Sequence, residues 1–472
     1  MTARLAATIV VTLCGIGFAA PLAAAGEWKA GVGRAVITPA APMWMSGYGS
    51  RDRPAQGKLH DLWAKALALE DASGNRAVLV TLDLCGIDRA LADRVRDRLS
   101  RDHWLGRESV ALNCSHTHSG PVVGDNLRTM YFLDEAQQKL IEDYTRELED
   151  KIVAVVADAL AGLAPAKLAW TVGTATFAVN RRNNPAAEVP ARRERGELRG
   201  PVDHDLPVLT VTAPGGGRNG GGDRDGNRDD GGKLRAVVFG YACHATTTGL
   251  YEWSGDWPGV AQIELEQAHP GATALFWAGC GADQNPLPRL TYQLLQEYGR
   301  QAAAGVRGAI DGGKLESIEP TLATSYSEVD LPFAELPTKD QVARDAASDD
   351  KYVAARAKRL LAHIERDGRL SPHYPYPVQV WRLGRDVRFV LLGGEVVVDY
   401  ALRLKRELGP RGTWVAGYTN DVMAYIPSAR VLGEGGYEGG GAMVYYGLPS
   451  KWAPQVEELI VAEVRRQVGE AK

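Results

Sequence analysis

Apolar and polar residues follow one another along this chain in segments that predict both strands and helices. Two early segments alternate apolar and polar positions and predict strands, Ala30–Pro39 and Trp63–Glu70. Arg76–Leu84 and Glu108–Cys114 are continuous apolar runs, which are typical of strands buried on both faces. Between them, Arg89–Trp104 carries apolar residues at helical spacing. The order strand, helix, strand predicts an α/β core in which some strands pair in parallel.

The same two kinds of segment continue to the end of the chain. Helical spacing predicts helices at Asp134–Leu163, Trp257–His269, Thr291–Ile310, Thr338–Arg366, Val396–Leu408 and Ser450–Lys472. Apolar runs predict strands at Lys167–Val179, Leu206–Ala213, Leu234–Ala242, Thr273–Ala278 and Ser325–Leu331, and a hairpin formed by Val378–Gly384 and Val387–Leu392. We therefore expect an α/β fold with a mixed, partly parallel β-sheet core flanked by helices.

Two segments differ from the rest of the chain. Residues 1–25 have Arg4, then the apolar stretch Leu5–Ala20, then small residues up to Ala25, which is the order of a secretory signal peptide. The alternative is an uncleaved N-terminal anchor, but the apolar run is short for a membrane span. Residues 214–233 form a glycine-rich insert without large apolar side chains, which predicts a flexible loop between paired strands. We expect an exported protein in which residues 26–472 form one domain.

Composition excludes several classes of protein. The chain has 54 basic and 58 acidic residues and a net charge of −4, so it offers no basic surface for nucleic acid. After removal of the signal, no apolar run is long enough for an integral membrane segment. The four remaining cysteines match no zinc knuckle or CxxC motif, and we expect buried thiols. They are Cys85, Cys114, Cys243 and Cys280.

Histidine and glutamate residues follow the predicted strands at points where a metal could bind. His116 and His118 lie directly after a buried strand and can point into one pocket, because alternate residues of an extended segment face the same way. This pair alone is compatible with metal binding or with structural histidines. His244 and Glu395 also follow strands, and two His with one Glu are ligands expected of a catalytic zinc. The chain has neither a GxxxxGK[ST] nor a GxSxG motif, which disfavours phosphate binding and a serine nucleophile.

Three further polar residues have open interpretations. His60 precedes a predicted strand, and we interpret it as a cap of that strand. Asp256 and Asp283 either orient a ligand histidine or cap neighbouring backbone.

A set of ordered motifs makes the chain similar to a known family. They are GVGRAVITP, MSGYG (Met45–Gly49), HDLWAKALALED (His60–Asp71), SHTHSGP (Ser115–Pro121), VNRR (Val179–Arg182), SGDWPG (Ser254–Gly259), GADQNP (Gly281–Pro286), GGE (Gly393–Glu395), GYTNDVMAYIP (Gly417–Pro427) and GYEGG (Gly436–Gly440). With these motifs the sequence resembles the catalytic domain of the neutral/alkaline non-lysosomal ceramidases. Members of this family are zinc amidases that split N-acylsphingosine into sphingosine and fatty acid.

The resemblance implies roles for individual residues. It implies one zinc ion per chain, held by His116, His244, Glu395 and Tyr437. It places His118 at the family position that acts in proton transfer, and Arg181 at the position of a pocket arginine. In this mechanism a zinc-bound water attacks the amide, Arg181 stabilises the oxyanion and His118 delivers a proton to the leaving amine.

The chain departs from the family pattern in two places. Asn285 stands where the family carries a functionally important Ser in a GDVSPN-type motif, which gives Asn285 a weaker claim to a catalytic role. Only Ser450–Lys472 follows the last motif, so we expect no C-terminal immunoglobulin-like domain. The leading expectation is an exported zinc amidohydrolase, periplasmic or extracellular, acting on a ceramide-like lipid or another small N-acyl amide. The alternatives are a zinc hydrolase on this scaffold acting on an ester or N-acyl carbohydrate bond, and a non-catalytic metal-binding protein.

Overall fold

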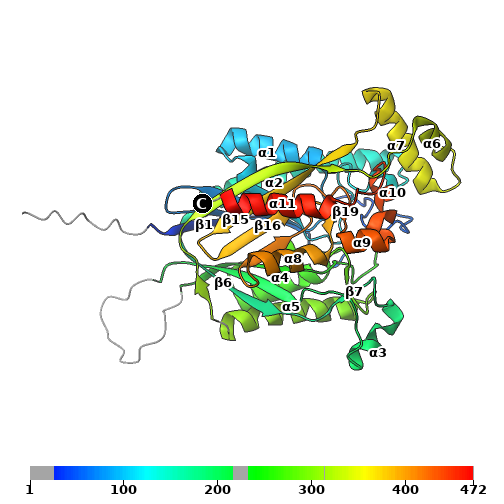
Figure 1. Ribbon diagram of the computed structural model, residues 1–472. Coiled ribbons are helices and arrows are strands. Elements are labelled where there is room, and N and C mark those ends of the chain that lie inside the picture. Colours follow the sequence, from blue (N-terminus) through cyan, green and yellow to red (C-terminus); the bar gives the residue numbers. More distant parts are fainter. Residues whose placement is uncertain (1–25, 216–231, 313, 471–472) are drawn as a thin grey trace, which may run out of the picture.

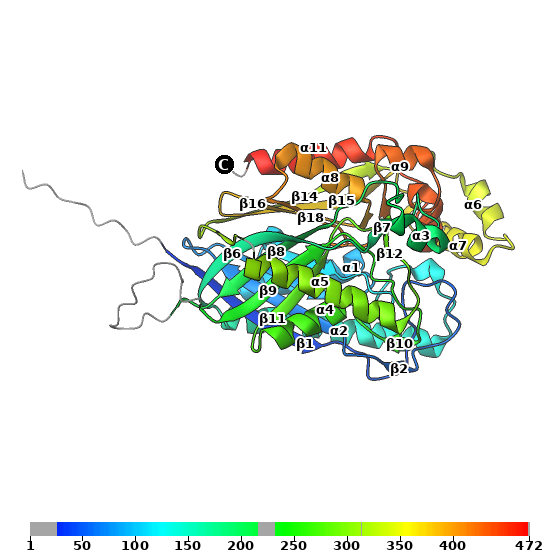
Figure 2. The same cartoon turned by 90° about the horizontal axis from the view of Figure 1, so that it is seen from below.

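The secondary structure elements of the protein form four layers. The computed structural model describes residues 26–215, 232–312 and 314–470. Figure 1 and Figure 2 show two β-sheets lying face to face, with helices on the outer face of each sheet. The predicted α/β fold with a mixed sheet core is confirmed.

The larger sheet has nine strands, which all lie between Trp28 and Ser317. Its strands are β1 (Trp28–Val36), β3 (Trp63–Glu70), β4 (Arg76–Leu82), β5 (Val110–Cys114), β6 (Ala164–Thr174), β8 (Asp205–Thr212), β9 (Leu234–Tyr241), β11 (Thr273–Ala278) and β13 (Glu316–Ser317). The order is β11-β9-β8-β6-β1-β3-β4-β5, and β13 pairs with β6. The end pairs β4–β5 and β9–β11 are parallel, and the strands between them pair antiparallel. The sheet is therefore partly parallel, as predicted.

The smaller sheet contains the predicted hairpin. Its strands are β14 (Leu322–Pro332), β15 (His373–Leu383), β16 (Val387–Leu392) and β18 (Thr413–Ala416). β15 and β16 pair antiparallel from Val378 opposite Leu392 to Leu383 opposite Val387, which confirms the hairpin around Arg385-Asp386. β16 and β18 are parallel, so their carboxyl ends lie at one edge of the sheet.

Helices cover both outer faces. α1 (Arg89–His103), α2 (Glu135–Ala161), α4 (Asp256–Ala268) and α5 (Tyr292–Gly312) lie on the side of the nine-stranded sheet, and α8 (Val398–Leu408) and α11 (Val456–Glu470) cover the four-stranded sheet (Figure 2). α2 lies very close to β1, because a Cβ atom at Gly33 would be 2.1 Å from the carbonyl oxygen of Val155. The glycines of the GVGR segment are thus required by helix packing.

A layer of large aromatic side chains fills the space between the two sheets. Trp277 of β11 lies 4.9 Å from the ring of Phe389 on β16 and 6.4 Å from the ring of Trp414 on β18. Trp28, Trp170 and Trp381 belong to the same buried cluster. Burial of such rings is a large hydrophobic contribution, and here it joins one sheet to the other.

Short elements complete the structure near the carboxyl ends of the strands. Three pairs of short strands are β2 (Gly57–Lys58) with β10 (Glu252–Trp253), β7 (Ala178–Asn180) with β12 (Gln284–Pro286), and β17 (Glu395–Val396) with β19 (Tyr425–Ile426). Short helices are α3 (Val189–Glu194), α9 (Ala429–Glu434) and α10 (Met443–Tyr446), with a π-helical turn η4 (Tyr437–Gly441) and the 3₁₀ turns η1 (Arg107–Ser109), η2 (Arg128–Met130) and η3 (Ala186–Glu188).

The long helix predicted at Thr338–Arg366 is wrong, because the segment forms two helices. They are α6 (Lys339–Asp345) and α7 (Lys351–Asp367). Thr338 and Gln341 form a capping box at the first helix, and the Asp350 side chain accepts hydrogen bonds from the N–H groups of Tyr352 and Val353. An aspartate that caps a helix starts a new one even where apolar spacing continues across the break.

Several expectations about processing stay predictions. The signal segment 1–25 lies outside the described residues, as does most of the insert at 214–233, and the division into signal and one catalytic domain remains an expectation. β8 and β9, which flank the insert, are neighbouring antiparallel strands, as predicted. All four described cysteines are buried free thiols. Among the described helices, none combines the length and apolar character that a membrane span requires.

Candidate metal centre and active site

The polar residues singled out from the sequence meet where the strands of both sheets end. His116 follows β5 and His244 follows β9 of the nine-stranded sheet, whereas Glu395 follows β16 of the smaller sheet. The chain turns sharply at His116, which has a left-handed backbone with φ of +59°. Such a conformation is costly for a residue with a side chain and is common at functional sites.

His116, His244 and Glu395 form a compact, fully buried cluster. Their potential ligand atoms all lie within 4.8 Å of one another. Oε2 of Glu395 is 3.2 Å from Nε2 of His116 and 3.3 Å from Nε2 of His244. Three segments far apart in the sequence therefore present two nitrogens and one oxygen to a single point.

The donor set of this cluster fits a metal cation. Nδ1 of His116 lies 2.6 Å from the carbonyl oxygen of Cys85, and Nδ1 of His244 lies 2.7 Å from that of Gly281. Each Nδ1 therefore donates its proton to the backbone, which leaves the Nε2 lone pair facing Glu395. Within the described chain, the buried Oε2 atom of Glu395 has no hydrogen-bond partner. Such an arrangement of unpaired acceptors requires a positive charge between them.

The ionisation of the three residues agrees with this requirement. Burial acts to raise the pKa of Glu395, but His116 and His244 hold it well below its usual value. Burial, together with the charge of Arg181, lowers the pKa of His244 to about 4, so its imidazole is neutral at pH 7. Burial acts to lower the pKa of His116, yet Glu395 raises it to about 10, so the Nε2 lone pair of His116 binds a cation at this point, a proton when no metal is bound and a metal in place of that proton.

Tyrosines that the sequence analysis did not assign surround the cluster. The Tyr446 hydroxyl donates to Oε1 of Glu395, and the Tyr418 ring stacks on His116 at 4.4 Å. The Tyr425 hydroxyl lies 3.5 Å from Nε2 of His244. Tyr418 and Tyr425 lie in the quoted GYTNDVMAYIP stretch, which could have indicated them, whereas Tyr446 lies in no quoted motif.

Tyr437, the fourth ligand implied by the resemblance, lies at the edge of the cluster. Its side chain is 42% exposed, and its ring lies 5.2 Å from the ring of Tyr425. It makes no hydrogen bond to His116, His244 or Glu395 in the described structure. The structure thus brings three of the four implied ligands together and leaves Tyr437 beside them.

His118 lies directly next to the three buried side chains. Its Nε2 atom is 3.2 Å from Nε2 of His116, and its ring contacts the ring of Tyr48 at 4.7 Å. Gly47 allows this position, because it has φ of +95° and a Cβ there would lie 2.3 Å from Cγ of His118. Nδ1 of His118 is buried without a hydrogen-bond partner among the described residues, so this ring is held by packing.

Arg181 directly follows β7, and its guanidinium points toward His244 of the cluster. Its Nε donates to Glu438 at 2.7 Å and one Nη donates to the Tyr425 hydroxyl at 3.2 Å. The other Nη lies 3.4 Å from Nε2 of His244 and 3.3 Å from Oδ1 of Asn285. Asn285 is buried on β12, which pairs with β7 opposite Val179. Two of the three predicted catalytic residues, Arg181 and Asn285, are therefore in contact.

The three residues with open interpretations hold backbone near the site. The Asp256 carboxylate accepts hydrogen bonds from the N–H groups of Thr247, Thr248 and Trp257. Asp283 accepts from the N–H of Val398 and from the side chain of Asn180. Neither contacts the ring of a ligand histidine.

His60 holds another segment of the chain. Its Nε2 accepts from the N–H of Gly255 at 2.8 Å, so it fixes the start of α4 rather than its own strand.

Comparison with known proteins identifies the family. The model of the N-terminal part of neutral/alkaline non-lysosomal ceramidases matches residues 28–272, which is more than half of the 472 residues. This chain belongs to that family. The match includes His116, His118, Arg181 and His244, whereas Glu395 and Tyr437 lie beyond it.

Curated ceramidases match shorter stretches of the chain. Neutral ceramidase 2 of Arabidopsis thaliana is 37% identical over 94 residues, which are 19% of this chain and 12% of that protein. Neutral ceramidase of Pseudomonas aeruginosa is 32% identical over 131 residues, 26% of this chain and 20% of that protein. The chain thus aligns with at most a fifth of the length of these two relatives.

Solved structures of ceramidases share the fold. The crystal structure of neutral ceramidase from Pseudomonas aeruginosa matches with a TM-score of 0.68 and 21% identity, over 93% of this chain and 75% of that chain. A ceramidase complexed with C2 matches with a TM-score of 0.67 and 18% identity, over 93% and 76% of the two chains. At these identities the likeness establishes the fold.

Proposed function

We propose that this protein is a zinc-dependent amidohydrolase that cleaves N-acyl amides, with ceramide-like lipids as the leading substrate class. The observation that carries this proposal is the buried His116–His244–Glu395 cluster, in which Oε2 of Glu395 faces two imidazole nitrogens without a hydrogen-bond partner among the described residues. Membership of the ceramidase family supports the amide bond as the target.

The donor set supports zinc as the metal. Two neutral imidazole nitrogens and one carboxylate oxygen form a ligand set typical of catalytic zinc, which keeps a further position open. Tyr437, whose ring lies 5.2 Å from the ring of Tyr425 beside the cluster, is the candidate fourth ligand. When bound, zinc lowers the pKa of a coordinated water to about 7 and polarises the amide carbonyl.

Arg181 is placed to stabilise negative charge on the substrate oxygen. Its guanidinium is permanently charged and is fixed by Glu438 and by the Tyr425 hydroxyl. A preoriented cation loses little freedom when charge develops on the carbonyl oxygen, so the stabilisation is larger than in water.

His118 is placed to hold and transfer the proton that the leaving amine needs. Its Nε2 lies 3.2 Å from Nε2 of His116, and its own Nδ1 is free of hydrogen bonds within the described chain. Burial and the neighbouring His116 and His244 lower the pKa of His118 well below its usual value, so its neutral imidazole first accepts a proton and then passes it to the departing amine nitrogen.

Asn285 supports a second candidate substrate class. Asn285 stands at the position where the family carries Ser. Its amide oxygen accepts a hydrogen bond from an Nη of Arg181 at 3.3 Å. This contact favours smaller or differently substituted N-acyl amides over long-chain ceramide. Export to the periplasm or the medium is part of the proposal and rests on the signal-like residues 1–25.

Metal analysis and hydrolysis assays on matched variants test the proposal. We expect about one zinc per chain in the parent, chelator-sensitive cleavage of N-acyl amides, and loss of both in His244→Ala. His373→Ala is the matched control, because His373 is an exposed histidine at the start of β15, and it should behave like the parent. Full zinc content in His244→Ala would remove His244 from the site, and zinc binding without amide cleavage on a broad panel would contradict the amidohydrolase.

A further inference from the structure

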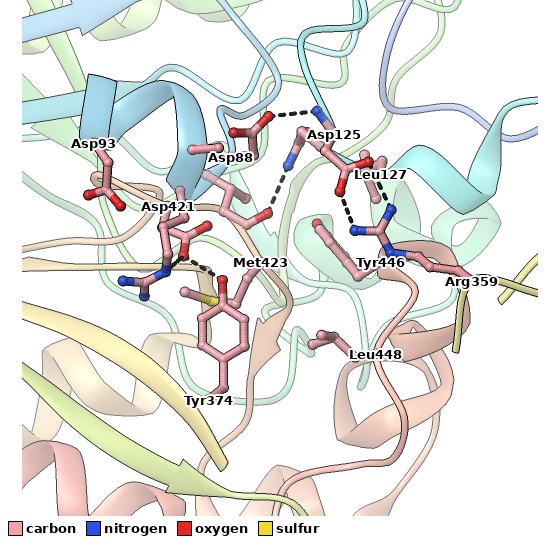
Figure 3. A pocket seen from close by; sticks show the side chains of 14 residues that line it. Asp88, Asp93, Asp125, Leu127, Arg359, Tyr374, Asp421, Met423, Tyr446 and Leu448 are labelled. Carbon is pink, nitrogen blue, oxygen red and sulfur yellow. Dashed lines mark hydrogen bonds and ion pairs between the residues drawn. The ribbon is translucent and has the colours of Figure 1, made fainter. Parts of the chain in front are cut away.

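A cavity lies next to the candidate active site and has no role in the proposed reaction. Its volume is about 350 Å³. It is bordered by the first turns of α1, by residues 125–127, by Arg359 of α7, by residues 421–423 and by Tyr446 with Leu448 (Figure 3). This volume is at the lower end of the range for small-molecule sites. Tyr446 is shared between the two sites, because it lines the cavity and donates to Glu395.

The lining of the cavity includes a buried carboxylate with a free oxygen. Asp421 is 3% exposed, and its Oδ2 receives the Tyr374 hydroxyl at 2.6 Å and lies 3.3 Å from Nε of Arg89. Its other oxygen, Oδ1, has no hydrogen-bond or ionic partner within the described ranges. Figure 3 shows both dashed contacts converging on one side of this carboxylate. This Oδ1 oxygen borders the cavity, where it can accept a hydrogen bond from a donor on a ligand.

The charged side chains that line the cavity are four Asp and two Arg. Asp93 is paired with Arg107, which does not line the cavity. Arg359 is engaged by both oxygens of Asp125, and Arg89 divides its charge between Asp421 and Glu328. The Asp88 carboxylate accepts only backbone N–H groups, from Leu91 and Asp125. Burial raises the pKa of Asp421 to about 7 and Asp88 and Asp93 add to the shift, although Arg89 opposes it, so a further positive charge would be favourable here.

The cavity also has an apolar part of its lining. Leu127, Val422, Met423, Leu448 and the ring of Tyr446 supply it. A ligand that satisfies the carboxylate and the apolar lining has a cationic hydrogen-bond donor on a short apolar body. An ammonium group provides the donor and the charge, and an alkyl chain provides the apolar surface.

We propose that this cavity binds a protonated alkylamine, with its ammonium group on Oδ1 of Asp421 and its alkyl chain against Leu127, Met423 and Leu448. An amine is also what the hydrolysis of an N-acyl amide releases, a link that rests on the proposed function. Binding itself requires neither hydrolysis nor a metal. The contact between Tyr446 and Glu395 gives a bound amine a direct physical connection to the candidate active site.

Three probes of equal chain length test the charge requirement. Octylamine, 1-octanol and octanoate are titrated into the full chain by isothermal calorimetry at pH 7, without substrate. We expect saturable binding of octylamine, about tenfold or more tighter than binding of octanol, and no binding of octanoate. Equal affinity for octylamine and octanol, preference for octanoate, or no binding of octylamine would overturn the proposal.

Two variants locate the binding. Asp421→Asn removes the carboxylate charge, and Leu448→Trp fills the cavity at its apolar lining from a half-buried position. Each should weaken octylamine binding by about tenfold or more, whereas Leu315→Trp, at an exposed leucine outside the cavity, should bind like the parent. If Asp421→Asn does not fold, Leu448→Trp carries the test. Undiminished binding in folded variants would overturn this site, and the assignment of amide hydrolysis would be unaffected because no turnover is measured.

Discussion

At the scale of single residues, the candidate site depends on histidine rings that backbone hydrogen bonds hold in one orientation. Backbone carbonyl oxygens of Cys85 and Gly281 accept the Nδ1–H groups of His116 and His244, so both rings direct Nε2 toward Glu395. The sequence could predict His116, His244 and Glu395, because each follows a predicted strand. It could not predict the contact from Tyr446, because no local pattern marks a side chain that reaches Glu395 from 51 residues away.

The contact between Asn285 and Arg181 yields a prediction about substrate size. Asn285 keeps one Nη of Arg181 at 3.3 Å from its amide oxygen, and a serine is too short to hold the guanidinium in the same way. We expect Asn285→Ser to raise kcat/KM for a long-chain ceramide by about tenfold, which corresponds to about 1.4 kcal/mol, with little change for a short-chain N-acyl amide.

Asn285→Ala is the control for this prediction, since it removes the amide without supplying a hydroxyl. A gain in Ser but not in Ala identifies the hydroxyl as the important group, and equal gains identify the loss of the Asn–Arg contact. Efficient long-chain cleavage by the parent, unchanged in both variants, would show that this position does not limit the substrate.

At the scale of elements, apolar spacing predicted which helices and strands exist better than it predicted where each one begins and ends. The β15–β16 hairpin, α1 and the buried strands β4 and β5 lie where the pattern placed them, because each buries an apolar face of its own period. The pattern predicted α6 and α7 as one helix, because the spacing of apolar residues contains no sign of the helix cap that Asp350 makes. It also missed that His60 acts on another element, the start of α4, because that contact joins residues 195 apart.

The hydrogen bond between His60 and α4 predicts a pH dependence of stability. Burial lowers the pKa of His60 to about 4, with Asp61 acting in the opposite direction, from an unfolded value of about 6.5. Because the folded state binds its proton less readily, this stabilisation is present above pH 6.5 and is lost as the pH falls toward 4. The free energy of unfolding should therefore decrease by roughly 3 kcal/mol over this range through His60 alone.

His60→Gln isolates this contribution, because an amide oxygen can accept from the Gly255 N–H and does not titrate. Denaturant unfolding of parent and variant between pH 7 and pH 4 should show a weaker pH dependence in the variant. Identical pH profiles would mean that His60 does not control the stability of this segment.

At the scale of the whole molecule, the two sheets each contribute part of the candidate metal site. His116 and His244 follow strands of the nine-stranded sheet, and Glu395 follows a strand of the four-stranded sheet. The buried tryptophans between the two sheets pack one sheet against the other. The sequence predicted a mixed sheet core but could not predict two sheets, because pairing between distant strands depends on contacts that no local window contains. We therefore expect that metal binding at this site would stabilise the fold.

A bound metal should therefore stabilise the entire chain rather than one loop. A ligand held only by the folded state adds stability in proportion to the logarithm of its excess over its dissociation constant, about 4 kcal/mol at a thousandfold excess. We expect chelation to lower the Tm of the parent while unfolding remains one cooperative transition, because the Trp277–Phe389–Trp414 contacts still join the sheets. His244→Ala should unfold at the Tm of the chelated parent or below it and should not respond to chelator, whereas His373→Ala should respond like the parent. Calorimetry with parallel metal analysis checks this, and a parent that loses its metal with no change in Tm would show that the site forms without holding the two sheets together.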